Sequence, residues 1–171
     1  MRGKSELVEK LMAAVAARQA ETGGLHLPGW GRAEWETVLA GAEVVEIGDG
    51  ELLIARDEPN RELFFLVEGQ LEVTVPQSDS MTFSPMVRIR PGSVVGEIAF
   101  LDGGARSASV WSRGPTVLFA LEKNAYAAFR RDHPSLACDL MQAIAQILAV
   151  RLRRTLGGSG QDGPASGGRV F

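Results

Sequence analysis

The residues best suited to chemistry lie in one stretch, residues 92–110. Within it, Gly96 and Glu97 precede a short apolar run, a Gly-Gly pair follows, and Arg106 and Ser107 come next. A short helix entered through glycine offers free backbone N–H groups and the positive end of its dipole, which suits a phosphate. Arg106 adds a planar fork that can hold two phosphate oxygens, and Ser107 adds a hydroxyl. The spacing predicts a small cradle for an anion.

Glu97 does not fit a site for an anion alone, because a carboxylate repels a phosphate unless it faces a hydrogen-bond donor. A sugar hydroxyl close to the phosphate supplies such a donor. Arg106 and Glu97 together therefore indicate a ligand with one phosphate and one neighbouring sugar hydroxyl, as in a cyclic nucleotide. His26 and His133 are isolated in the sequence, and the single cysteine, Cys138, cannot alone hold a structural metal. We therefore predict binding without catalysis and without a metal.

At these positions the sequence resembles the cyclic nucleotide-binding domain family of catabolite activator proteins, protein kinase A regulatory subunits and cyclic nucleotide-gated channels. The phosphate-binding cassette of that family has glycine, glutamate, two or three apolar residues, a variable loop, arginine, serine or threonine, and alanine. Residues 96–100 and 106–110 match this pattern. The resemblance continues upstream through residues 50–53 and 63–69, and it covers about residues 28–154.

The resemblance implies a role for each cassette residue. The Gly96 N–H and the Glu97 carboxylate would hold the ribose 2′-hydroxyl, and Arg106 would pair with the exocyclic phosphate oxygens. Ser107 and the backbone of Ala99 would complete the shell. The ligand-binding set predicted in this way is Gly96, Glu97, Ile98, Ala99, Arg106, Ser107 and Ala108. In that family, threonine at this position often accompanies cGMP tolerance, so the resemblance implies that Ser107 favours cAMP over cGMP.

The resemblance also implies that the last long helix forms a lid over the base. The candidate base-capping residues on it are Leu148, Arg151 and Leu152. For Arg151, Arg153 and Arg154 an alternative is a solvated helix end, whose cations complement the helix dipole. The apolar stripe from Leu140 to Leu148 fits either packing on the β core or a homodimer seam.

Hydrophobic periodicity predicts the elements that position these residues. A helix is expected to begin at Ser5, as its N-cap, and to stop at Gly23-Gly24. Between residues 44 and 121, short apolar runs alternate with turn residues, which favours antiparallel β-structure. The continuous apolar run at 64–67 predicts a strand buried on both faces, and Glu68-Gly69-Gln70 predicts a hairpin turn after it.

The remaining patterns complete the predicted architecture. Alternation at residues 70–75 predicts a half-buried strand, and helical spacing returns at 124–131 and 136–154. The predicted fold is mainly β: an antiparallel, jelly-roll-like β-roll with N-terminal helices and a C-terminal helical lid. The expected parts are an amphipathic helix at 1–24, a cyclic nucleotide-binding domain at 25–156, with its β-roll at about 43–122 and its C-terminal helices at about 124–156, and a flexible glycine-rich tail at 157–171.

The composition is that of an ordinary globular chain of 171 residues, with 45% hydrophobic and 23% charged residues. The net charge of −3 leaves no basic surplus for nucleic acid. No apolar run approaches the roughly 18 residues of a membrane span, and a lone cysteine is compatible with a reducing compartment. We therefore expect a cytoplasmic protein with no nucleic-acid partner and no membrane insertion.

These features predict a non-catalytic sensory module, without a cofactor, that reversibly binds cAMP or else cGMP. Binding would be relayed through the C-terminal helices to an effector protein or to a dimer mate. The family's transcription factors continue into a helix-turn-helix domain, whereas this sequence ends in a glycine-rich stretch, so we expect a stand-alone domain. An alternative is a ligand-blind protein–protein interaction or dimerisation module with a degenerate fold, in which Glu97 and Arg106 form an ordinary ion pair.

Overall fold

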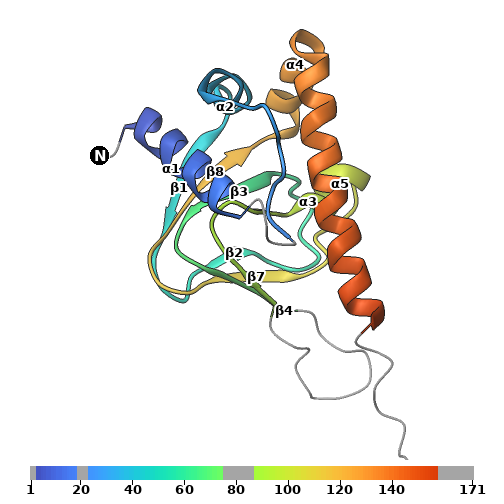
Figure 1. The fold of residues 1–171 in the computed structure, drawn as a ribbon. Helices are drawn as coiled ribbons and strands as arrows, with labels where there is room; N and C mark the ends of the chain where they lie inside the picture. Colours follow the sequence, from blue (N-terminus) through green and yellow to red (C-terminus); the bar gives the residue numbers. More distant parts are fainter. Residues whose placement is uncertain (1–2, 19–22, 75–86, 158–171) are drawn as a thin grey trace, which may run out of the picture.

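A computed structural model of the protein describes residues 3–18, 23–74 and 87–157 of the 171. Within these residues, eight strands form two antiparallel four-stranded sheets (Figure 1). The first sheet has the order β1 (Glu43–Ile47), β8 (Thr116–Leu121), β3 (Leu63–Glu68) and β6 (Val94–Val95). The second has the order β2 (Leu52–Ile54), β7 (Ser109–Ser112), β4 (Leu71–Thr74) and β5 (Val87–Ile89). The predicted antiparallel β-roll is confirmed.

Helices flank the roll on the N-terminal and the C-terminal side of the strands, as predicted. In the described part of the chain they are α1 (Lys4–Ala17), α2 (Arg32–Leu39), the short α3 (Glu97–Asp102), α4 (Lys123–Asp132) and α5 (Pro134–Gly157). Helix α4 ends at Asp132, and His133 follows as its C-cap, because a residue that precedes a proline is pushed out of the helical region. The long α5 runs along one side of the molecule and passes close to α3 (Figure 1).

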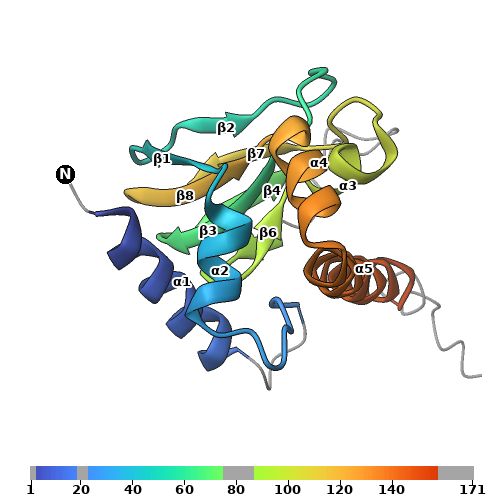
Figure 2. The same cartoon turned by 90° about the horizontal axis from the view of Figure 1, so that it is seen from above.

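Strands β3 and β8 of the first sheet are buried on both faces, which explains the continuous apolar run in β3. Leu63 and Phe65 pack with the helices, whereas Phe64 and Leu66 pack against the second sheet, and all four are at most 5% exposed. Successive side chains of a strand point to opposite faces, so a strand between two layers has no polar face. In Figure 2, α1 and α2 lie on one side of β3 and β8.

Gly69 forms a turn, but the predicted hairpin is wrong. Strand β3 pairs with β8 and β6, while β4 pairs with β7 and β5, so residues 68–70 connect the two sheets. Gly69 has φ +87°, and a Cβ there would lie 2.6 Å from the Pro115 carbonyl oxygen. Turn chemistry marks where the chain reverses, but strand partners are chosen by the packing of the whole roll.

Helix α1 packs into the core of its own domain through Leu7, Val8, Leu11 and Val15, which are at most 4% exposed. Its predicted ends are wrong by a few residues. The N-cap is Gly3 rather than Ser5, and the helix ends at Ala17, ahead of the glycine pair at 23–24. Ser5 instead uses its hydroxyl to accept a hydrogen bond from Arg32 of α2, so a tertiary contact replaces the predicted local one.

The stripe on α5 packs on the β core and does not form a dimer seam. Leu140, Ile144 and Ile147 are at most 1% exposed and belong to the same core as α1 and β3. Leu148, next along the stripe, is partly buried against that core. Gly157 falls within α5, and the rest of the predicted tail, residues 158–171, lies outside the described residues.

By length and composition, one helix in the described part of the chain could cross a membrane. It is α5 over Pro134–Arg154, with a mean hydropathy of 1.3. A core helix passes the same test, and the face of α5 that carries Ile144 is part of the core. We therefore assign α5 to the core, and the absence of membrane insertion stays a prediction.

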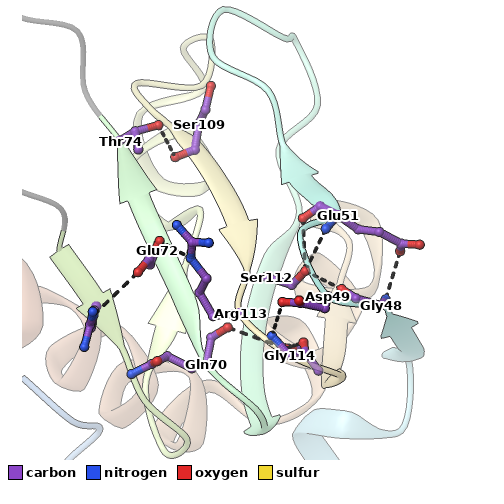
Figure 3. A network of polar contacts seen from close by, with 12 residues as sticks. Gly48, Asp49, Glu51, Gln70, Glu72, Thr74, Ser109, Ser112, Arg113 and Gly114 are labelled. Carbon is purple, nitrogen blue, oxygen red and sulfur yellow. Dashed lines mark hydrogen bonds and ion pairs between the residues drawn. The ribbon is translucent and has the colours of Figure 1, made fainter. Parts of the chain in front are cut away.

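Strand β4 contains a buried carboxylate that alternation did not predict. Glu72 is 4% exposed, and it forms ion pairs with Arg113 and, at 3.5 Å, with Arg88 of the adjacent strand β5 (Figure 3). The alternation predicted a solvent-facing side chain here, but the two long arginines cover it. Val75, the last residue of the predicted alternation, lies outside the described residues.

Candidate functional site

The predicted glycine entrance to a short helix is present. Strand β6 ends at Val95, and α3 begins at Glu97 with Gly96 as its N-cap in the left-handed region, φ +80°. A Cβ at Gly96 would lie 2.8 Å from the Glu62 carbonyl oxygen and would collide with the Arg106 guanidinium. Glycine is therefore needed here both for its backbone conformation and for the close approach of Arg106.

Arg106 is held in a fixed orientation by three protein acceptors. Its Nε donates to Asn60 Oδ1 at 2.5 Å, its Nη1 to the Gly96 carbonyl at 3.0 Å, and its Nη2 to the Glu62 carbonyl at 2.9 Å. Its backbone N–H also donates to the Glu58 carbonyl at 3.0 Å. The loop at 58–62 thus supports both the backbone and the side chain of Arg106.

These supporting residues were missed by sequence reasoning. Asn60 lies 46 residues before Arg106, in a segment that the pattern marked only as a turn. Nothing in the spacing of a single sequence relates the two. The signal that could have indicated them is the hydrogen-bonding need of a buried guanidinium. Its N–H groups require acceptors, and the polar loop at 58–62 offers them.

Arg106 carries a buried positive charge that has no direct ion pair. The side chain is 2% exposed, and among the described residues no carboxylate oxygen lies within ion-pair distance of it. Burial lowers the pKa of the Arg106 guanidinium from its ordinary value, and nearby carboxylates, Glu62 foremost, act to raise it. An arginine keeps its proton at any physiological pH. The site therefore presents an unmatched cation that an anion would stabilise.

Glu97 is buried as well, at 4% exposed, but its partner is not Arg106. It forms an ion pair with Arg151 of α5. The alternative of an ordinary Glu97–Arg106 ion pair is therefore wrong. The two side chains are still neighbours, because the Glu97 charge is one of the causes that raise the Arg106 pKa. They lie close together without neutralising one another directly.

The lid residues have three different environments. Arg151 reaches the cassette, where its Nη2 donates to the Val94 carbonyl at 2.8 Å and to Ser93 Oγ at 3.4 Å. Leu148 is partly buried against the core, and Leu152 is 59% exposed. The interpretation of Arg151 as a solvated cation is therefore wrong, whereas Arg153 and Arg154 are exposed.

The other predicted binding residues lie around Arg106 and α3. Ala99 is 1% exposed, and Ile98 beside it is 41% exposed. Ser107 is exposed and Ala108 is partly buried, in the segment between Arg106 and β7. Strand β7 begins only at Ser109. Arg106 therefore belongs to an irregular segment, where it can face the cassette.

The loop that supports Arg106 also borders a hollow of about 280 Å³. The hollow is lined by Pro59, Asn60, Arg61, Glu62, Glu122, Lys123 and Asn124. Lys123 packs its ammonium over the Phe100 ring of α3, 4.8 Å from the ring centroid. Across residues 3–18, 23–74 and 87–157, no three His, Cys, Asp or Glu side chains gather to hold a metal ion.

Two curated proteins from Bradyrhizobium diazoefficiens are similar in sequence to part of this chain. Glutaminase 2 is 34% identical over 103 residues, which is 60% of this chain and 16% of that protein. Glutaminase 1 is 28% identical over 123 residues, which is 67% of this chain and 19% of that protein. The chain thus spans less than a fifth of the length of these relatives.

Two solved structures and a family model also match this chain. A cyclic nucleotide-binding domain from Methylobacillus flagellatus KT is similar with a TM-score of 0.77 and 19% identity, covering 99% of this chain and 89% of that one. The Thermus thermophilus catabolite activator protein has a TM-score of 0.66 and 25% identity, covering 78% and 60%. The model of the cyclic nucleotide-binding domain matches residues 44–133, more than half of the chain. This protein therefore belongs to the cyclic nucleotide-binding domain family.

Proposed function

We propose that this chain is a non-catalytic regulatory module that reversibly binds a cyclic nucleotide, with cAMP preferred over cGMP. The observation that carries the proposal is Arg106, a buried guanidinium whose acceptors are all uncharged oxygens. Its three side-chain bonds leave N–H groups free for a further acceptor. A phosphate at this point would neutralise the positive charge of Arg106 and accept hydrogen bonds from these remaining N–H groups.

We assign the ligand's parts to the cassette as follows. Arg106 and Ser107 bind the phosphate oxygens, and Gly96 and Glu97 bind the ribose 2′-hydroxyl. The backbone of Ala99 completes the phosphate shell, with Ile98 and Ala108 beside it. Glu97 is suited to its role because, among the described residues, one of its carboxylate oxygens is engaged, by Arg151, and no partner is found for the other. The other oxygen can accept from a hydroxyl.

The choice of cAMP rests on Ser107, because threonine at this position often accompanies cGMP tolerance in the family that the sequence resembles. Among similar folds, the regulatory domain of Toxoplasma gondii PKA is crystallised with cAMP, and an acyltransferase from Mycobacterium smegmatis is described as cAMP-binding. Another similar structure belongs to work on a cyclic-GMP-dependent signalling pathway. These neighbours support a cyclic nucleotide as ligand, and Ser107 carries the preference.

The output passes to another domain or protein. In the glutaminases the matching segment is a small part of a much longer enzyme, which fits a module that regulates chemistry done elsewhere. Helix α5 is the route we propose, because it contacts the cassette through Arg151 and exposes Leu152 and Leu156, at 59% and 68%, further along. These leucines suit an effector surface or a dimer mate. We place the module in the cytoplasm, where cyclic nucleotides are signals.

The rival function is a ligand-blind interaction module. One observation favours it: Arg106 and Glu97 both have protein partners in the described structure. The two functions differ in a measurable way, because only a ligand-binding module gains stability from a nucleotide.

A thermal shift separates the two functions. At a hundredfold excess over Kd a ligand stabilises the fold by about 2.7 kcal/mol, which raises the Tm of a domain of this size by about 5–11 °C. We expect this rise with cAMP, a smaller one with cGMP, and none in Arg106→Gln. Arg88→Gln is the matched control, since it removes an exposed arginine of β5 that pairs with Glu72 and has no contact with Arg106 or Glu97 in the described residues. No rise with either nucleotide in the unsubstituted protein would establish the ligand-blind module.

A further inference from the structure

A second hollow, of about 300 Å³, lies between the segment that leads into α2 and the first half of α5. One wall is formed by residues 26–28, and the other by Asp139, Gln142, Ala143 and Gln146 of α5. In Figure 1 the segment before α2 runs beside α5. None of the lining residues belongs to the cassette or to the loop that supports Arg106. The hollow is therefore separate from the proposed nucleotide site.

Both walls of this hollow are anchored in the core, so its shape exists before any ligand binds. Leu27 is 5% exposed and Ala143 is 1% exposed, and both belong to the core that contains residues of α1 and β3. The turn at 27–30 is closed by the Trp30 N–H, which donates to the Leu27 carbonyl at 3.2 Å. The other lining side chains, His26 and Pro28 on one wall and the polar residues of α5 on the other, are exposed. A preformed hollow with an apolar base and a few polar groups is the usual form of a small-molecule site.

The Asp139 carboxylate in this hollow is held in place by a tryptophan. The Trp30 Nε1–H donates to Asp139 Oδ2 at 3.3 Å. The Trp30 ring packs edge-on against Trp35, with 5.3 Å between the ring centroids, and Trp35 is 2% exposed. A tryptophan fixed in this way sets the direction of the carboxylate to which it donates. Each carboxylate oxygen has two lone pairs, so Asp139 keeps acceptor capacity for a ligand.

The charge and the acceptors of the hollow indicate that its ligand is a cation. With histidine neutral, Asp139 is the charged group among the lining residues in the described part of the chain, and its charge is negative. Gln142 and Gln146 follow it by three and seven residues, which places all three on one face of α5. Their amide oxygens and the carboxylate give three kinds of acceptor group along one wall. A primary ammonium has three N–H donors and no acceptor, so it matches this wall.

We propose that this hollow is a second binding site, for a small primary alkylammonium ion. The ammonium donates to Asp139 and to the amide oxygens of Gln142 and Gln146, and the alkyl chain lies against Leu27 and Ala143. A neutral alcohol of the same length fits the same space but lacks the charge that Asp139 complements, and hydrogen bonds between ions are about twice as strong as neutral ones. The site does not depend on the proposed function, because it shares no residue with the cassette.

A titration of the nucleotide-free protein with n-butylammonium chloride tests the proposal. It is followed by NMR of the indole N–H groups of the three tryptophans. The Trp30 signal should move in a saturable way, because its N–H is bonded to the carboxylate that receives the ammonium. The signal of Trp111, on β7, should stay in place, and sodium chloride at the same ionic strength should move neither. n-Butanol should bind at least about tenfold more weakly, since it offers no charge to Asp139.

Substitutions on α5 then identify the groups that hold the ammonium. Asp139→Asn should weaken n-butylammonium binding about tenfold, and the wall should keep its shape because the asparagine carbonyl can still accept from Trp30. Gln142→Ala should weaken binding about threefold, the size expected for one neutral acceptor. Asp57→Asn is the matched control: it removes a carboxylate with an 82% exposed side chain outside the hollow, and it should leave Kd unchanged.

Four results would overturn the proposal. The first is no movement of the Trp30 signal in the unsubstituted protein. The second is equal affinity of the Asp139→Asn and unsubstituted proteins for n-butylammonium, which would show that the carboxylate does not receive the ammonium. The third is equal affinity for n-butanol, which would show an apolar hollow without charge recognition. The fourth is a Trp111 shift as large as that of Trp30, which would show non-specific association of the amine.

Discussion

Glu72 and Arg106 are both buried charged side chains, 4% and 2% exposed, yet their surroundings differ. Glu72 lies on β4 between two arginines, Arg113 and Arg88, and both are more than half exposed in their side chains (Figure 3). Arg106 lies beside the turn into α3, and its acceptors within the described part of the chain are all uncharged. One charge is compensated within the fold, and the other is not.

The difference separates a structural charge from a binding charge. A fold that needs a buried ion for its own stability pairs it, because an unpaired buried charge is costly. Retaining an unpaired one requires a rigid frame of neutral dipoles, such as the loop at 58–62 provides for Arg106. Such an arrangement is useful where an anion binds and leaves.

The largest effect is expected from Gly96→Ala. Its Cβ would collide with Arg106 and lie 2.8 Å from the Glu62 carbonyl oxygen, at a backbone φ of +80°. Left-handed strain of about 1–2 kcal/mol and overpacking of about 1–3 kcal/mol should both lower the free energy of unfolding, measured in urea. Nucleotide binding should be lost as well.

Gly114→Ala is the matched control for Gly96→Ala. Its φ is +78°, but a Cβ there meets nothing within 4 Å. Gly114→Ala should lower the free energy of unfolding only by the backbone strain, about 1–2 kcal/mol, and should leave nucleotide affinity unchanged. Equal losses of stability for the two glycines would show that the approach of Arg106 to Gly96 has no energetic importance.

An intermediate effect is expected from Asn60→Ala. The substitution removes the acceptor of the Arg106 Nε and leaves a buried charged donor without it. The free energy of unfolding should fall by about 1.5–3 kcal/mol, and cAMP should bind about tenfold more weakly because the fork is less well oriented. Urea unfolding and calorimetry measure the two effects. If the free energy of unfolding falls by this amount but cAMP affinity is unchanged, Asn60 supports the loop but not the binding geometry.

The smallest effect is expected from Glu72→Gln. The amide oxygen can still accept from Arg113, and both arginines stay solvated because they are largely exposed. The loss of stability should be below about 1 kcal/mol, and cAMP affinity should not change. A large drop in affinity would contradict the separation between the structural and the binding charge.

Much of the fold followed from local patterns, and the failures have a common cause. The apolar run of β3, the glycine entrance to α3 and the proline stop after α4 depend on neighbours in the sequence, so they could be predicted. The pairing of strands around Gly69 and the cover of Glu72 depend on elements far along the chain. Periodicity gives the faces of an element but not its partners.

The site divides in the same way. Gly96, Glu97 and Arg106 could be singled out because their types and spacing are those of an anion cradle with a sugar-binding carboxylate. Asn60 and Arg151 could not be given their roles, since one lies 46 residues before Arg106 and the other 54 residues after Glu97. Arg151 was considered only as a base cap or a solvated cation, and its contact with Glu97 appears only when α5 packs on the roll.

The sequence by itself therefore determined the chemistry of the cassette: a guanidinium, a carboxylate and a glycine-entered helix within a span of eleven residues, 96–106. Only the tertiary structure decided how the two charges are used. Burial raises the strength of every electrostatic contact, and whether a buried charge is matched depends on which distant segments the fold brings to it. Here the fold brings an arginine to Glu97 and only uncharged oxygens to Arg106.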